Sequence, residues 1–394
     1  MFGILRAGER LAALERLVRK LDDAQHARAS LVDTRIEQLA ERVAQQPTAK
    51  DLRELRQAVR AMAPREDRQT LDEIGRIAAS AGPILVGPWT GELGFELLYW
   101  IPFVQWVRRQ WNIPRERLFV ISRGGVASWY GVDETRYADV FSFIGADEFR
   151  DAVAEEKRKQ RRVAALDERL VSAVRDRHGL GDAELLHPRV MYRLFAPFWS
   201  EEAGYARIEQ FTRYAGEAWG EPLRREKDDP PQESLSLPPG YAAVRFYFSE
   251  CFPDTPENRA FAQGVVLSLA ERQPVVLLNP GFSVDEHEDW TASASGRVHT
   301  LAGQLNPATN LGVQAAVIRG ARAFVGTYGG YAYLAPFCGV PATAFFSRRT
   351  FKQHHLYAAQ RAFEHAGAAA LTVVDVSAAP LVQSALAALA AVHS

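Results

Sequence analysis

The chain has 394 residues, of which 47% are hydrophobic and 24% are charged. This is the composition of a folded globular protein, and it excludes an intrinsically disordered chain. The length exceeds that of one typical domain, so we expect two core units. The chain has 47 lysines and arginines and 48 aspartates and glutamates, so its formal net charge is -1. That balance excludes a global field that attracts nucleic acid, and an anionic substrate must be held by a local site.

Cysteine content and hydropathy indicate the compartment. The two cysteines, Cys251 and Cys338, are too few for a disulfide framework and lack the spacing of metal ligands, which favours a reducing compartment. No run of about 18 uncharged apolar residues occurs, and the first residues lack an apolar core followed by a cleavage site. The sequence therefore predicts a cytoplasmic protein, with any contact at the inner membrane being peripheral.

Residues 1–64 carry a helical repeat. Apolar side chains recur at alternating steps of three and four residues, which places them on one stripe of a helix, as in a coiled coil. Pro47 cannot continue a helix interior, so two or three helices fit better than one rod. We therefore predict an α-helical coiled-coil extension that makes the chain a homo-oligomer. The alternatives are helices folded back on the body of the protein and a cationic face that touches an anionic membrane.

An α/β pattern follows this extension. Apolar runs predict strands at residues 84–87, 118–121 and 140–144, and helices are expected at 95–106, 155–175 and 201–218. The first strand leads into the glycine-rich turn GPWTGELG and then into the first of these helices, which is typical of a nucleotide-binding α/β layer. Strands that alternate with helices predict a parallel sheet covered on both faces. We assign residues 79–220 to this domain.

Residues 221–240 are rich in proline and charge, which is typical of an interdomain linker. Beyond it, residues 241–394 show the most regular alternation in the chain. Strands are predicted at 241–248, 274–278, 323–325, 340–346 and 371–374, and helices at 256–272, 310–320, 331–338 and in the Ala- and Leu-rich C-terminal segment. This pattern predicts a second parallel α/β domain.

The turn after the strand at 323–325 is the most informative motif. Thr327, Tyr328, Gly329 and Gly330 form a polar, glycine-rich turn that opens a helix. Unpaired amides and the positive end of the helix dipole converge at such a turn, and glycine lets a ligand approach the backbone. These residues are predicted to hold a diphosphate, although such glycines also occur merely for tight packing.

The order of strand, G-T-x-G-G turn, Ala-rich helix, small-Gly-x-Pro and apolar strand resembles the C-terminal donor domain of GT-B glycosyltransferases. The heptosyltransferase-like and O-fucosyltransferase-like groups are the most similar, and the likeness covers roughly Tyr241 to Val374. The resemblance implies an α/β fold of two Rossmann-like domains, with the acceptor met by residues 79–220 and a nucleotide-sugar donor bound by residues 241–394. It implies no required metal or other cofactor.

The same resemblance suggests the donor contacts. Arg245, inside an apolar strand, matches a basic residue that approaches the donor phosphates, with a structural salt bridge as the alternative. Asn279 and Gly281 end the next strand and would face the same crevice. Asn306 and Thr309 belong to a loop that resembles the one after the nucleobase-contacting strand, where helix capping by Thr309 is the alternative.

The glycine-rich turn of the first domain is the predicted acceptor site, with Gly91 and Gly94 in contact with the acceptor. An inverting transfer needs a group that takes the acceptor hydroxyl proton. Glu92, in the turn itself, is the preferred base. Glu96 could share that face, although a glutamate in a first turn also stabilises the helix dipole. Asp133 with the neighbouring Glu134 is the fallback.

Four further features need an interpretation. Arg123, before two glycines, is a candidate to hold an acceptor carboxylate or phosphate, or else belongs to a surface turn. Trp129 and Tyr130 are predicted to form a stacking wall for a sugar ring. Residues 285–289 are acidic, but consecutive residues cannot all face one ion, so a solvated loop is predicted rather than a metal site. The histidine pair 354–355 has no spacing-defined partner and stays outside the predicted site.

The resemblance therefore implies a metal-independent, inverting glycosyltransferase of bacterial surface polysaccharide synthesis. Its substrates would be a nucleotide sugar and a glycan or lipid-linked acceptor. The alternatives are a non-catalytic nucleotide- or sugar-binding scaffold and another two-domain α/β enzyme, such as an epimerase or a pyruvyl transferase.

Overall fold

The computed structural model describes residues 67–156, 160–214, 235–282, 287–293, 296–350 and 353–377. The predicted coiled coil at residues 1–64, most of the linker at 221–240 and the C-terminal helix lie outside these ranges. Among the described residues, 70–196 and 205–377 belong to one compact unit, and 67–69 with 197–204 belong to another. Both parallel sheets and the candidate site lie in the first unit.

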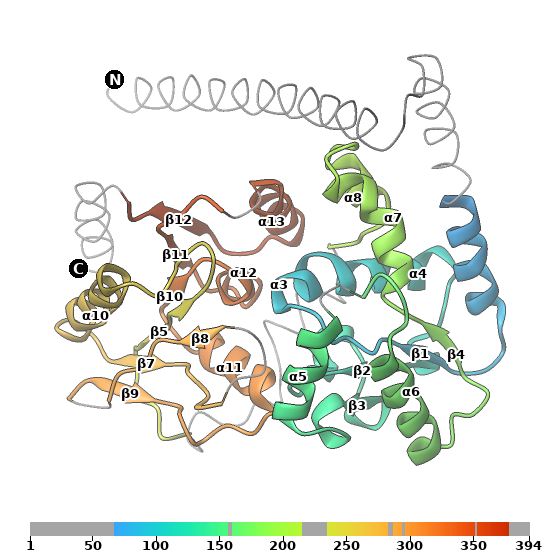
Figure 1. Ribbon diagram of the computed structural model, residues 1–394, viewed down its shortest axis with the longest axis horizontal. Coiled ribbons are helices and arrows are strands. Elements are labelled where there is room, and N and C mark those ends of the chain that lie inside the picture. Colours follow the sequence, from blue (N-terminus) through green and yellow to red (C-terminus); the bar gives the residue numbers. More distant parts are fainter. Residues whose placement is uncertain are drawn as a thin grey trace, which may run out of the picture. The chain divides into compact units, whose positions relative to one another are not determined.

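The first sheet has four parallel strands in the order β3-β2-β1-β4. They are β1 (Ile84–Val86), β2 (Leu118–Ser122), β3 (Tyr137–Asp139) and β4 (Glu184–Leu186). The strands β1, β2 and β3 are buried along their whole length, as apolar strands covered on both faces must be. The helices α5 (Ala146–Glu156) and α6 (Ala165–His178) pack on one face, around Leu85 and Phe119. Figure 1 shows α4 (Ile101–Gln110) on the opposite side of this sheet from α6.

The second sheet has six parallel strands in the order β12-β11-β10-β5-β7-β9. They are β5 (Ala242–Arg245), β7 (Val275–Leu277), β9 (Val298–Thr300), β10 (Ala323–Thr327), β11 (Ala342–Phe346) and β12 (Leu371–Asp375). Numbered along the chain, this order is the 3-2-1-4-5-6 of a doubly wound sheet. The order reverses between β5 and β10, and ligands of such sheets bind beyond the carboxyl ends of the strands at that point.

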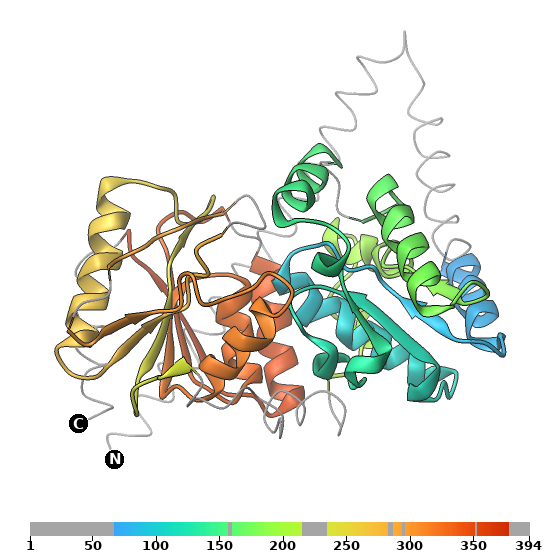
Figure 2. The ribbon, with the colours of Figure 1, turned by 90° about the horizontal axis from the view of Figure 1, so that it is seen from below.

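Helices cover both faces of the second sheet. The helix α10 (Pro256–Ala270) contributes Ala262, Val265 and Val266 to the core on one face. Figure 2 shows α11 (Asn310–Arg319) and α12 (Gly330–Phe337) on the other face. The helix α13 (Gln353–Ala366) precedes β12, and a small antiparallel pair joins β6 (Tyr247–Phe248) to β8 (Glu288–Asp289). The fold is therefore α/β with two parallel sheets.

The remaining helices are short or irregular. The chain leaves β1 through α3 (Leu93–Phe95) and the π-helical segment η1 (Glu96–Trp100), which continues directly into α4. Residues 67–79 are also helical. The others are α7 (Arg189–Trp199), α8 (Ala206–Gln210) and the 3-10 turns η2 (Arg115–Arg117), η3 (Ala127–Tyr130), η4 (Glu134–Arg136) and η5 (Val140–Ser142). No helix of the described ranges combines the length and apolar character needed to cross a membrane.

Three of the predicted elements were wrong. The apolar run at 140–144 forms the turn η5 rather than a strand, because the carboxylate of Asp139 accepts the amide of Phe141 and ends β3 there. The charged stretch at 155–175 is divided between α5 and α6 instead of forming one helix. Residues 189–199 form the helix α7, which was not predicted, and the helix expected at 201–218 is reduced to α8 within the described residues.

Candidate functional site

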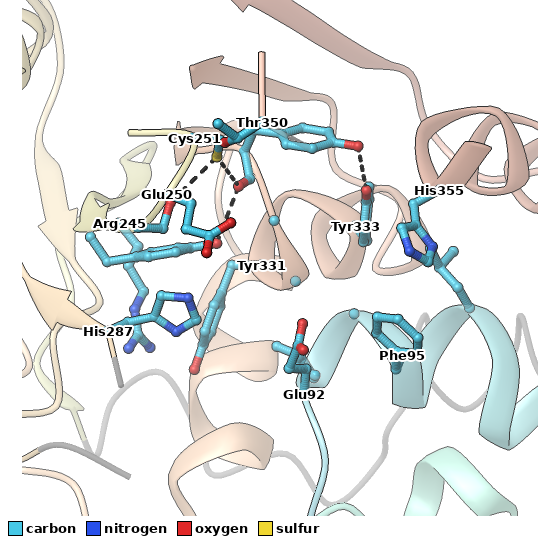
Figure 3. A pocket seen from close by; sticks show the side chains of 18 of the residues that line it. Glu92, Phe95, Arg245, Glu250, Cys251, His287, Tyr331, Tyr333, Thr350 and His355 are labelled. Atoms are coloured by element: carbon cyan, nitrogen blue, oxygen red, sulfur yellow. Dashed lines mark hydrogen bonds between the residues drawn. The ribbon is translucent and has the colours of Figure 1, made fainter. Parts of the chain in front are cut away.

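A cavity of about 590 Å³ lies at the carboxyl ends of strands from both sheets. Figure 3 shows side chains from both sheet regions facing it. The first region contributes residues 92–95, Leu98, Tyr99, Arg150, Val153 and Ala154, and the second contributes Arg245, Tyr247, 249–251, His287, 328–331, Tyr333, Thr350 and His355. Its volume is within the range of pockets that hold small organic ligands.

The reversal point of the second sheet supplies one wall. Arg245 ends β5, and the turn 328–330 follows β10, the neighbouring strand. The hydroxyl of Thr327 accepts the amide of Tyr247 and donates to the Tyr247 carbonyl, so it ties β10 to β6. Thr327 is fully buried and does not line the cavity, whereas Tyr328, Gly329 and Gly330 do.

The N-terminus of α12 opens beside this cavity. Gly329 is the N-cap residue and offers no side chain to cap the first turn, while its carbonyl accepts the amide of Tyr333. The first amides of a helix have no acceptor inside the helix, and the dipole adds partial positive charge there. A side chain at Gly329 would overlap the hydroxyl of Tyr247. The arrangement is chemically suited to an anionic group.

The two glycine-rich turns touch each other. A Cβ atom at Gly330 would lie 2.9 Å from the Cβ of Leu93 and 3.0 Å from the amide nitrogen of Gly94. A Cβ atom at Gly94 would lie 3.3 Å from the ring of Tyr333. Only glycine permits this approach without displacement, so the start of α12 and the start of α3 lie against each other.

Glu92 is the residue immediately before that contact. It is the N-cap residue of α3, its carbonyl accepts the amide of Glu96, and its side chain is exposed at the cavity. Figure 3 shows the Glu92 carboxylate on the cavity wall, near Tyr331 of α12. The structure therefore brings together Glu92, Gly94 and the predicted turn 328–330.

Arg245 also lines the cavity, but protein groups engage its guanidinium. Nε and Nη2 donate to the carboxylate of Asp289 at 3.2 Å each, and Nη1 donates to Oε1 of Gln314 at 2.8 Å. The guanidinium also lies 4.1 Å from the centre of the Tyr331 ring. The alternative of a structural salt bridge, given above for Arg245, is thus present.

Asp289 corrects the interpretation of the acidic segment as a solvated loop. It belongs to β8, which pairs with β6, and its side chain is only 17% exposed. His287 lines the cavity with its ring 4.9 Å from that of Tyr247. Residues 285 and 286 lie outside the described ranges. Among the described residues, no group of three or more His, Cys, Asp or Glu is arranged to hold a metal ion.

Glu96 does not reach the cavity. It is fully buried, and its Oε1 accepts hydrogen bonds of 2.6 Å from both the Ser122 hydroxyl and the Tyr130 hydroxyl. Burial raises the pKa of Glu96, while the charge of Arg123 and the two hydroxyl donors oppose that rise. A carboxyl group enclosed in this way cannot meet a substrate in the cavity, which removes Glu96 as a base there.

The predicted acceptor wall is also corrected. Trp129 and Tyr130 are 1% and 0% exposed, so neither ring offers a face to a sugar. Arg123 is 6% exposed, and its Nη2 donates to the carbonyl of Gly91 at 2.5 Å, so it holds the protein's own turn. Gly91 itself does not line the cavity.

The fallback base Asp133 and its neighbour Glu134 lie apart from this cavity. Asp133 accepts the amide of Thr135 at the start of η4, and the side-chain hydrogen bond from Thr135 lowers the pKa of Asp133. Both carboxylates are exposed, and neither lines the cavity. They are therefore not brought together with the other predicted site residues.

Four predicted donor contacts lie outside the cavity as well. Asn279 is 2% exposed and donates to the carbonyl of Trp290 at 2.7 Å. Gly281 has a φ of 83° in a turn beside Gly303. Asn306 and Thr309 form an exposed turn before α11: the Asn306 carbonyl accepts the Thr309 amide at 3.0 Å.

The sequence interpretation missed several cavity residues. The hydroxyl of Tyr99 lies 2.6 Å from Nδ1 of His355, and both residues line the cavity. Cys251 lies on the same wall, with its Sγ 3.7 Å from the carbonyl of Tyr328, and burial raises the pKa of its thiol. Since these contacts join distant positions, no local spacing identifies them.

No protein-family model and no curated protein matches the chain. Among solved structures, it is similar to a crystal structure provisionally assigned as a UDP-N-acetylglucosamine 2-epimerase from Listeria monocytogenes. The two share 12% sequence identity, the match covers 75% of this chain and 84% of that chain, and the TM-score is 0.32. A similarity of this degree does not bear on activity, so the strand order and the cavity carry the functional argument.

Proposed function

We propose that the protein is a glycosyltransferase that moves a sugar from a nucleotide-sugar donor to a glycan or lipid-linked acceptor. One observation carries the proposal. Gly330 at the start of α12 lies against Leu93 and Gly94, so a helix N-terminus and the carboxylate of Glu92 share one cavity. An anion-binding group and a proton acceptor on one cavity wall are the two parts that sugar transfer from a nucleoside diphosphate requires.

The donor diphosphate is proposed to bind at the start of α12. The amides of the first turn and the helix dipole supply positive potential, and Gly329 and Gly330 leave the backbone accessible. The guanidinium of Arg245 is engaged by Asp289 and Gln314, so its proposed role is to support the ring of Tyr331 rather than to clamp phosphate.

The acceptor hydroxyl is proposed to attack the anomeric carbon of the donor sugar while Glu92 takes the hydroxyl proton. The new carbon–oxygen bond forms as the bond to the diphosphate oxygen breaks, and the nucleoside diphosphate leaves with that electron pair. The amides at α12 stabilise the charge that develops on the leaving oxygen. No metal ion is required in this scheme, so we expect excess EDTA to leave the rate unchanged.

The experiment combines donor binding with product analysis. UDP-glucose, UDP-N-acetylglucosamine, GDP-mannose and dTDP-glucose are screened by thermal shift, and the products of any binder are identified by mass spectrometry and NMR. Glu92→Gln is expected to lower kcat by about 10²- to 10⁴-fold with donor Kd unchanged, because a general base contributes about that much. Glu134→Gln is the matched control, since this exposed carboxylate does not line the cavity.

The outcomes separate the candidate activities. Full activity of the Glu92→Gln variant rejects the base assignment. A donor returned with one inverted carbon and no transfer identifies an epimerase, and tight binding without any turnover identifies a non-catalytic binding protein. Failure of all four nucleotide sugars to bind rejects the donor site for these nucleotides.

A further inference from the structure

Residues 87–92 form the turn that carries Glu92, and we call them the Glu92 turn. Hydrogen bonds from other parts of the chain engage several of its backbone amides and carbonyls. The amide of Gly87 donates to the Leu186 carbonyl at 3.0 Å, and the amide of Trp89 donates to the Ile121 carbonyl at 2.9 Å. These two bonds extend β1 toward its neighbours β4 and β2. The rest of the turn does not continue this pairing with neighbouring strands, so its remaining buried amides and carbonyls need side-chain partners.

Gln160 supplies those partners in the middle of the turn. Its Oε1 accepts the amide of Thr90 at 3.1 Å, and its Nε2 donates to the carbonyl of Pro88 at 2.8 Å. Nε2 also donates to Oδ1 of Asp167 at 3.0 Å. Because Thr90 presents a donor while Pro88 and Asp167 present acceptors, the partners determine which end of the amide is oxygen. Gln160 thus makes the backbone hydrogen bonds that a neighbouring strand would otherwise make.

The partner of Gln160 is itself fixed. Asp167 Oδ2 accepts the amide of Ala164 and lies 3.0 Å from Nε2 of His187, and both Asp167 and His187 are 1% exposed. Nδ1 of His187 accepts the amide of Arg189 at 3.1 Å, so the proton of a neutral ring is on Nε2 and is donated to Asp167. Both carboxylate oxygens of Asp167 therefore have partners, which oppose reorientation of Gln160.

Arg123 holds the far end of the turn. Its Nη2 donates to the Gly91 carbonyl at 2.5 Å, one residue before Glu92. The side chain is 6% exposed, and its positive charge opposes the effect of burial on the pKa of Glu96.

We propose that Gln160 and Arg123 are positioning residues that fix the carboxylate of Glu92 at the cavity wall. The proposal rests on the proposed function, in which Glu92 is the base, and adds two residues that touch no substrate. Since a base must lie within hydrogen-bonding distance of the proton it takes, a turn that moves by an ångström loses rate. Loss of either support is expected to lower kcat while donor binding at α12 remains.

The test compares two buried glutamines. Gln160→Met keeps the length of the side chain but removes its hydrogen bonds to Pro88 and Thr90. Gln105→Met is the matched control, because Gln105 is 2% exposed, donates to the Tyr130 carbonyl, accepts from Arg108 and has no hydrogen bond to residues 87–92 in the described structure. Hydrogen–deuterium exchange of the amides at 89–92 is measured in both variants and in the wild type. Gln160→Met is expected to raise exchange there about tenfold or more, and the control is expected to leave it unchanged.

Arg123→Lys is the second variant, in case Gln160→Met does not fold. It keeps a positive charge beside Glu96 but loses the guanidinium geometry at Gly91. For whichever of the four nucleotide sugars is turned over, both variants are expected to lower kcat about tenfold with donor KM unchanged. A purely structural defect would instead lower the amount of folded enzyme and leave kcat per folded molecule intact.

The proposal is overturned if exchange at residues 89–92 stays within twofold of the wild type in both variants. It is also overturned if Gln105→Met raises that exchange as much as Gln160→Met does. If the wild type turns over none of the four nucleotide sugars, the proposed function fails for them, whereas the exchange data still decide whether Gln160 and Arg123 hold the turn.

Discussion

The contact between the two glycine-rich turns can be tested by adding one methyl group. Gly330→Ala places a Cβ atom 2.9 Å from the Cβ of Leu93 and 3.0 Å from the amide nitrogen of Gly94. Both distances are shorter than normal van der Waals contact, and one of the two atoms belongs to the backbone. Since the methyl group cannot rotate away, the start of α12 or the start of α3 must move.

The expected cost follows from this geometry. Inserting a methyl group into a filled site costs about 1–3 kcal/mol, and the better helix propensity of alanine offsets at most about 1 kcal/mol of it. We therefore expect the free energy of unfolding to fall by about 1–2 kcal/mol. The displacement also moves the amides proposed to hold the diphosphate, so the affinity for a bound nucleotide sugar is expected to fall about tenfold.

Gly264→Ala provides the matched control. Gly264 lies inside α10, and a Cβ atom there would meet no heavy atom within 4 Å. The same substitution is therefore expected to stabilise the protein by about 0.5–1 kcal/mol. Urea unfolding followed by tryptophan fluorescence compares the two variants with the wild type. If Gly330→Ala is as stable as Gly264→Ala, the two turns do not touch and the shared cavity is refuted.

Three further predictions concern charges and thiols. Burial raises the pKa of Asp139 from 3.8 to about 6, so the folded state holds this proton more tightly than the unfolded chain does. The stability contributed by this group is complete below pH 4 and is lost as the pH rises through 6. The difference in unfolding free energy between wild type and Asp139→Asn should change by about 2.5 kcal/mol between pH 4 and pH 7, and a flat difference in urea titrations would contradict this. Arg245→Met removes the ion pair with the mostly buried carboxylate of Asp289 and is expected to cost about 3 kcal/mol, which the double variant with Asp289→Leu should partly restore in a double-mutant cycle. Additive losses would mean that the pair is not coupled. Cys251 and Cys338 are both buried, so each thiol of the native protein should react with a disulfide reagent at pH 8 far more slowly than free cysteine, and complete reaction within seconds would show that Cys251 is open to solvent.

Local pattern was sufficient for the elements that frame the site. The apolar run that forms β10 and the glycines after it predict a strand, a turn and a helix, and the structure has β10 and α12 there. The first such unit, from β1 to α4, was likewise predicted, with the π-helical segment η1 inside it. Strand and helix periodicity depend on neighbouring residues, so one sequence determines them well.

Position within an element was not sufficient to assign a role. Glu92 and Glu96 are one helical turn apart, yet Glu92 is exposed at the cavity and Glu96 is fully buried. The difference arises because Glu92 is the N-cap residue of α3 and lines the cavity, whereas Glu96, in η1, accepts hydrogen bonds from Ser122 and Tyr130. The side of a helix that meets the protein interior is decided by packing.

The sequence by itself determined the class of fold and the two glycine-rich turns, since both depend on residues that are neighbours along the chain. Only the tertiary structure decided their partners. Arg245 meets Asp289 44 residues away, Gln160 meets Pro88 72 residues away, and Tyr99 meets His355 256 residues away. The first two pairs join elements within one sheet region and the third joins the two regions, and no local periodicity carries that information.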